Sequence, residues 1–141
     1  MAISSRELSS LYIPLRLTYG LVPIAAGTDK FLNILTDWKK YLPTDASAIL
    51  PVSPPTFMMI VGVIEIAAGL SVLTKLPRLG ACVVTVWLSL IAVNLIVAGY
   101  PDIAVRDLVM AIGAFTLSQL AALHGDSWLP NSTRSLPLDV D

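Results

Sequence analysis

Residues 56–74 read TFMMIVGVIEIAAGLSVLT, and Glu65 is the only charged residue among these nineteen. A helix rises about 1.5 Å per residue, so this stretch is long enough to cross the hydrocarbon core of a bilayer, which is roughly 30 Å thick. Pro55 precedes it, and Lys75 and Pro77 follow it, as is typical of residues that flank a helix. We therefore predict a membrane-spanning helix at 56–74.

Three further apolar stretches have a comparable length, and they lie at 11–35, 79–98 and 103–123. The turns on either side of 79–98 are short, which makes consecutive helices antiparallel. The sequence thus predicts an all-α membrane protein, an antiparallel bundle of four transmembrane helices in a domain at 1–125.

Two segments interrupt the apolar pattern. The loop at 36–55 contains four prolines and several charged residues, and a short helix is predicted within it at 46–50. Trp38 and Tyr41 in this loop are predicted interface anchors, because amphipathic rings favour the boundary between membrane and water. The polar tail at 126–141 has no periodic apolar pattern, so we expect it to be flexible or to be ordered only by a partner.

The overall composition agrees with a membrane location. Hydrophobic residues make up 55% of the chain and charged residues 13%, and the mean hydropathy is +0.77. Soluble domains carry about 25% charged residues, so this composition excludes the surface of a soluble enzyme. The net charge of −1 provides no basic excess for nucleic acid. We expect the lipid bilayer and other membrane subunits, and not nucleic acid, as partners.

Residues that bind metals or cofactors are scarce. Cys82 is the only cysteine and His124 the only histidine. These counts exclude an intrachain disulfide, a cysteine-rich metal cluster and a pair of histidine ligands to haem within one chain. We therefore expect no metal and no covalently bound cofactor, and the residues indicate no catalytic group.

Charged and amide side chains inside the apolar stretches are the most informative residues, because each costs a few kcal/mol at membrane depth if it is unpaired. Counted from the helix ends, Glu65 lies near the middle of the membrane. Lys30, Asn94, Arg106 and Asp107 lie one to two turns below the membrane surface on the side of the loop at 36–55. All four helices thus bring polar groups to the same half of the bundle. The candidate polar pocket consists of Lys30, Glu65, Asn94, Arg106 and Asp107.

Two interpretations of these residues stay open. They can form a structural ion-pair network, in which Lys30 and Arg106 extend to the lipid headgroups. Alternatively they form a ligand site, in which Glu65 accepts a proton, the two cations stabilise its charge or bind an anionic oxygen, and Asp107 orients Arg106. Arg16 lies near the opposite surface and is predicted to be a lipid headgroup anchor.

The distribution of basic residues predicts the orientation. An even number of spans places both termini on one side together with the turn at 75–78. That side carries more basic residues outside the membrane than the opposite side, so the termini are predicted to be cytoplasmic. The residues compared are Arg6, Lys75, Arg78 and Arg134 on the terminal side, and Lys39 and Lys40 on the other.

Three short motifs resemble those of the DoxX-like membrane proteins of the DoxX/DoxD superfamily. They are LRLTYG at 15–20, which leads on to GTDKF at 27–31, then GVIEIAAG at 62–69, and VRDL at 105–108. The resemblance covers about 11–122 and implies a small four-helix protein of the bacterial inner membrane. Related DoxD-type proteins are subunits of a thiosulfate:quinone oxidoreductase. The motif positions that carry over are Arg16, Lys30, Glu65, Arg106 and Asp107.

The leading functional hypothesis is a small membrane subunit that binds a quinone headgroup or a small anion in this pocket and works with a redox partner. The chain has no redox centre of its own, so electrons would come from a bound quinone or another subunit. The main alternative is a non-catalytic accessory or assembly subunit of a larger respiratory or photosynthetic membrane complex. A third alternative is a small transporter or lipid-handling protein.

Overall fold

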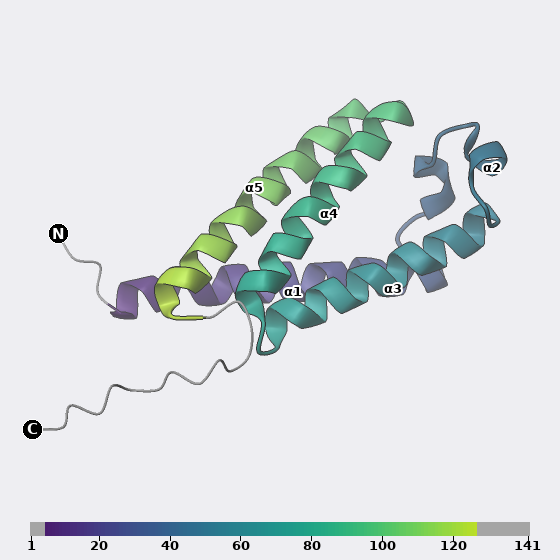
Figure 1. Cartoon of the computed structure of the whole chain (residues 1–141). Helices are drawn as coiled ribbons and strands as arrows, with labels where there is room; N and C mark the ends of the chain where they lie inside the picture. Colours follow the sequence, from purple (N-terminus) through teal and green to yellow (C-terminus); the bar gives the residue numbers. More distant parts are fainter. Residues whose placement is uncertain (1–4, 127–141) are drawn as a thin grey trace, which may run out of the picture.

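The computed structural model describes residues 5–126, and its regular structure within that range is entirely helical (Figure 1). Part of the predicted tail, residues 127–141, lies outside the described residues. The elements are α1 (Ser5–Leu32), the short 3-10 helix η1 (Trp38–Tyr41), α2 (Ala46–Ile49), α3 (Pro54–Leu73), α4 (Pro77–Val97) and α5 (Pro101–His124).

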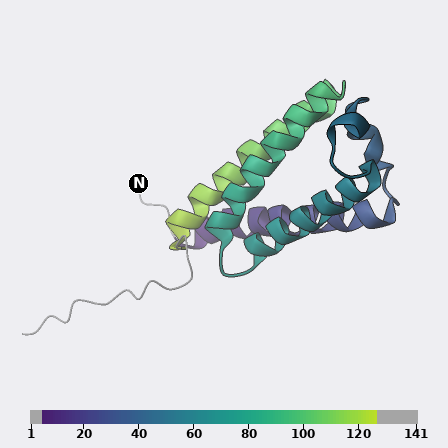
Figure 2. The same cartoon turned by 45° about the vertical axis from the view of Figure 1, so that its right-hand side comes forward.

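The four long helices form two pairs that diverge like the arms of a V. Helix α1 packs along α3, and α4 packs along α5, while contacts between the pairs are fewer (Figure 1). The pairs meet at the α3–α4 turn (74–76) and the last turn of α5, which we call the vertex. They are farthest apart at the opposite end, which carries η1, α2 and the α4–α5 turn (98–100) and which we call the loop end (Figure 2).

Proline and glycine mark the ends of the helices. Pro54, Pro77 and Pro101 stand at the first positions of α3, α4 and α5, where a helix has no acceptor for the backbone N–H that proline lacks. Helix α5 ends at His124 and is capped by Gly125, whose φ of 97° is accessible to glycine at little steric cost. The prolines at the starts of α4 and α5 are consistent with the tight turns that join α3 to α4 and α4 to α5.

Paired glycines bring α1 and α3 into backbone contact. A Cβ atom on Gly27 would lie 2.5 Å from the carbonyl oxygen of Gly62, and one on Gly62 would lie 2.6 Å from that of Gly27. A Cβ on Gly69 would likewise collide with the carbonyl oxygen of Gly20. Small residues at such spacing allow close helix approach, so these two pairs explain the tight packing of α1 on α3.

The helix bounds differ from the predicted ones mainly in α1. This helix spans Ser5–Leu32 rather than 11–35. It ends early because Asn33 adopts a positive φ of 51° and the side chain of Asp29 accepts hydrogen bonds from the next backbone N–H groups, including that of Leu35 at 3.1 Å. The other long helices begin and end within two residues of the predicted positions, and the short helix predicted in the loop is confirmed as α2.

Helices α3, α4 and α5 are each long and apolar enough to cross a membrane. Their outward faces carry large apolar side chains, such as those of Val97 and Ile112, each 67% exposed. Exposed apolar surface of this extent suits lipid and not water. The described residues thus indicate an all-helical membrane protein with three helices of membrane-spanning character, while α1 is 28 residues long but carries charged side chains near both ends.

Candidate functional site

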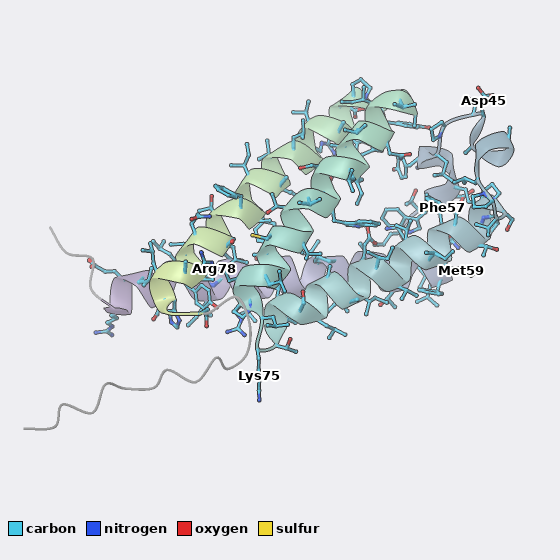
Figure 3. All side chains as sticks on the ribbon, viewed as in Figure 1. Asp45, Phe57, Met59, Lys75 and Arg78 are labelled. Atoms are coloured by element: carbon cyan, nitrogen blue, oxygen red, sulfur yellow. The ribbon has the colours of Figure 1, made fainter. Side chains whose placement is uncertain are left out.

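A cleft of about 590 Å³ lies between the two helix pairs and is lined by all four long helices and η1. Phe57 lies on the cleft side of α3, whereas Met59, two residues farther on, lies on the outer side (Figure 3). All five predicted pocket residues line this one cleft, namely Lys30, Glu65, Asn94, Arg106 and Asp107. Trp38 and Tyr41 line it as well, but Arg16 does not.

Lys30 and Glu65 form a buried ion pair on the α1–α3 wall of the cleft. Lys30 Nζ lies 2.6 Å from Glu65 Oε2, and the two side chains are only 5% and 7% exposed. The ammonium group also lies 3.8 Å from the ring centroid of Trp38, within the range of a cation–π interaction. Lys30 therefore compensates the charge of Glu65, and this pairing occupies one of the two carboxylate oxygens.

Asp29 holds Trp38 in place over Lys30. Trp38 Nε1 donates to Asp29 Oδ2 at 2.7 Å, and the backbone N–H groups of Ile34 and Leu35 donate to Asp29 Oδ1 at 3.0 and 3.1 Å. Asp29 thus satisfies donors just beyond the end of α1 and orients the aromatic ring that covers the ion pair. The sequence alone does not indicate that Asp29 bonds to this loop.

Aromatic side chains meet at the loop end of the cleft. Asn94 Nδ2 donates to the backbone oxygen of Tyr41 at 2.8 Å, which joins α4 to η1. The ring of Tyr41 meets that of Tyr100 edge-on, with centroids 5.1 Å apart. Trp38 and Tyr41, predicted as interface anchors, are therefore both half-buried and held by contacts within the chain.

Arg106 and Asp107 are adjacent in sequence but lie in different surroundings. Asp107 is 9% exposed, whereas Arg106 is exposed. Consecutive helical positions project about 100° apart, so the two side chains do not face each other. No ion pair joins them within residues 5–126. The charge of Asp107 instead interacts with those of Glu65 and Lys30 across the cleft.

Arg16 donates hydrogen bonds to the backbone carbonyl groups at the end of α3, at the vertex. Its guanidinium group donates to the carbonyl oxygens of Val72 and Leu73 at 3.0 Å each and of Thr74 at 2.6 Å. The last carbonyl groups of a helix have no partner within the helix, so a side chain from elsewhere is well placed to satisfy them. The predicted lipid anchor is thus a contact between α1 and α3, and the structure does not bring it to the other candidate residues.

Trp87 is a cleft residue that the sequence analysis did not single out. It lies halfway along α4, its indole N–H is buried, and it makes no hydrogen bond at standard distance and angle. The group lies beside the carboxylate of Glu65. Its position could have identified it in the sequence. Tryptophan in membrane helices favours the interfaces, whereas Trp87 lies in the middle of its helix.

Comparison with family models, with curated proteins and with solved structures gives no match to this chain. The similarity to DoxX-like proteins therefore stays a prediction. Within residues 5–126, no group of three histidine, cysteine, aspartate or glutamate residues could hold a metal ion. The geometry itself offers an apolar cleft with ionisable groups on its walls, which suits a ligand with a polar head and an apolar body.

Proposed function

We propose that the chain is a four-span protein of the bacterial inner membrane that holds a quinone-class molecule in the cleft and works with a redox partner. The fourth span would be α1, which is 28 residues long and packs along α3 through paired glycines. Because α1 and α3 are in backbone contact, α1 would enter the bilayer together with α3. Polar residues of α1 that face the cleft, such as Lys30, would then be shielded from lipid.

The observation that carries the proposal is the combination of volume and chemistry in the cleft. Its volume of about 590 Å³ falls in the usual range of about 300–1,000 Å³ for ligand sites. Its walls are mainly apolar, and the buried Lys30–Glu65 pair provides charge near mid-depth. A quinone has a compact polar ring and an apolar tail, which matches this distribution, whereas a small anion would meet a lysine that already bonds Glu65.

Electron transfer in this proposal depends on a second protein. The chain has a single histidine and a single cysteine, so it cannot hold a haem between two of its own histidines or form a disulfide redox pair. The partner would supply or accept the electrons, and the cleft would supply a shielded place for the quinone. The apolar outer faces of the helices provide the surface on which such a membrane partner could pack.

The proposed orientation places both termini in the cytoplasm. Basic residues at the vertex end include Arg6, Lys75 and Arg78, and those at the loop end outside the cleft are Lys39 and Lys40. Positive charge is enriched in cytoplasmic segments, so the vertex would face the cytoplasm and the loop end the opposite side. Quinone would then sit in the outer half of the membrane.

Purification in a mild detergent tests the proposal. The full chain is isolated from its native membrane, bound quinone is measured after organic extraction, and copurifying proteins are identified by mass spectrometry. We expect quinone at a fixed ratio to the protein, reduced in Glu65→Gln and retained in Glu7→Gln, a matched change on the exposed first turn of α1. Absence of quinone from the unaltered protein would refute the quinone site.

The same experiment addresses the second candidate function. Two observations favour a non-catalytic accessory subunit. The apolar outer faces are exposed, and a purely structural role, holding α1 against α3, would be enough to explain the ion pair. A large partner at fixed stoichiometry without quinone would support this alternative. If Glu65→Gln lowered both the helical content and the amount of bound quinone, the carboxylate of Glu65 would be needed for the fold and not for binding.

A further inference from the structure

Asp107 is the one acidic side chain on the cleft wall without a hydrogen bond or ion pair among the described residues. It is 9% exposed, so more than nine-tenths of its surface is covered, but its oxygen atoms are not sealed inside the protein. A buried carboxyl group without a hydrogen-bond partner is costly. A ligand in the cleft could provide the missing partner.

Glu65, the residue that the sequence favoured as proton acceptor, is in a different state. Its Oε2 atom bonds Lys30 at 2.6 Å, and the indole N–H of Trp87 lies beside the same carboxylate. Uptake of a proton at Oε2 would break the ion pair with Lys30, so Glu65 cannot change its protonation state there without losing an existing contact. Asp107 has no such donor and is free to change its protonation state.

We infer that Asp107 is the group that exchanges a proton with the ligand headgroup, and that Glu65 serves to hold Lys30. This assignment rests on the proposed quinone site. The protonated carboxyl of Asp107 would donate to a quinone carbonyl oxygen, and the ionised carboxylate would accept from a quinol hydroxyl. Of the two carboxyl groups that line the cleft, only Asp107 offers both states without breaking an existing bond of the described structure.

The proton balance of the reaction follows from this arrangement. When the quinone is reduced, the redox partner supplies the electrons, the O–H bond of Asp107 breaks, and an O–H bond forms on the adjacent quinone oxygen. The other quinone oxygen takes its proton from water, and water then reprotonates Asp107. When the quinol is oxidised, the same steps run in reverse and the partner accepts the electrons.

The charged groups that face Asp107 come from the neighbouring helices. Glu65 on α3 and Lys30 on α1 act on it in opposite directions, and Arg106 precedes it on α5. Helix α4 carries no charged residue except Arg78 at its vertex end. Because Lys30 and Glu65 neutralise each other, the protonation of Asp107 changes the net charge of the cleft wall.

Binding of decylubiquinone and decylubiquinol to the purified full chain tests the inference. The affinity for each probe is measured by calorimetry over a range of pH, and the ratio of the quinol affinity to the quinone affinity is plotted against pH. In the unaltered protein we expect the preference for the quinol to rise by about tenfold as Asp107 ionises, since a hydrogen bond to an ionised group is roughly twice as strong as one to a neutral group. In Asp107→Asn the ratio should not change with pH.

Two further variants separate the possible outcomes. Glu65→Gln should keep the pH-dependent ratio, and if it does not fold, Lys30→Met/Glu65→Gln removes both charges together. Asp102→Asn, an exposed change on the first turn of the same helix, is the control and should behave as the unaltered protein. The inference fails if Asp107→Asn keeps the pH dependence or if the Glu65 variants abolish it. If the unaltered protein binds neither probe, the quinone site itself is refuted.

Discussion

The buried ion pair between Lys30 and Glu65 makes a quantitative prediction about stability. Lys30→Met removes the ammonium group but keeps an unbranched side chain of similar shape, and it leaves Glu65 charged and buried without its partner. Breaking one side of a buried pair costs about 3–5 kcal/mol. The two side chains are 5% and 7% exposed and their charged atoms lie 2.6 Å apart, so we expect this full range.

The double variant Lys30→Met/Glu65→Met distinguishes an ion pair from two independent effects. With both charges gone, no buried charge is left uncompensated, and the total cost should fall to within about 2 kcal/mol of the unaltered protein. The coupling energy obtained from the four proteins should therefore exceed about 2 kcal/mol. Denaturation in mixed micelles, followed by circular dichroism, gives the free energies of unfolding.

The chain contains a matched control in the loop. Lys39 Nζ lies 3.7 Å from Asp37 Oδ2, with side chains 47% and 59% exposed. Lys39→Met should change the free energy of unfolding by less than about 1 kcal/mol, because exposed pairs contribute little. Additive single effects at Lys30 and Glu65, or equal effects in the buried and exposed pairs, would refute the reasoning.

Three further predictions concern the packing of the helices. Gly27→Ala places a methyl group 2.5 Å from the carbonyl oxygen of Gly62, so it should separate α1 from α3 and cost about 1–3 kcal/mol in the same denaturation assay, whereas an unchanged value would contradict this. Arg16→Met should accelerate backbone hydrogen exchange in the last turn of α3 and the turn to α4, which mass spectrometry can detect, and unaltered exchange there would exclude the capping role. Asn94→Ala removes the bond to the Tyr41 carbonyl and should widen the spin-label distance between α2 and the α4–α5 turn, while an identical distance distribution would show that the aromatic contacts suffice.

The sequence predicts the long helices and the gathering of their polar residues around one cleft. The stretch at 56–74 corresponds to α3, and the five residues assigned to one polar pocket do line one cleft. Both results follow from the axial rise of a helix, which converts residue number into height. The three helices that can span a membrane were all predicted from length and apolar character.

Rotation about the helix axis could not be predicted in the same way. A helix that is apolar on every side shows no preferred face, because lipid and protein interior are both apolar. Arg106 and Asp107 have nearly the same depth, yet one is exposed and the other is buried. For this reason the sequence did not reveal that Asp107 turns away from Arg106, or that Arg16 reaches the end of α3.

The contacts between α1 and the loop that follows it could not be predicted from the sequence either. The early end of α1 depends on Asp29, whose carboxylate bonds both the following backbone and Trp38. These are contacts between residues five to nine positions apart that require a particular turn at Asn33. The sequence contains no repeat or spacing from which this turn could be inferred.

The V arrangement gives the protein the mechanics of a lever. The fulcrum is the vertex, where the two pairs meet, and α3, with 20 residues at 1.5 Å each, extends about 30 Å from it. A tilt of about 5° at the fulcrum would displace the far end of an arm by about 3 Å, which is comparable to the thickness of an aromatic ring. At that far end, the hydrogen bond from Asn94 to the Tyr41 carbonyl joins α4 to η1 and limits how far the arms can separate. Bilayer thickness and lateral pressure, which act on helix tilt, would thereby set the width of the opening.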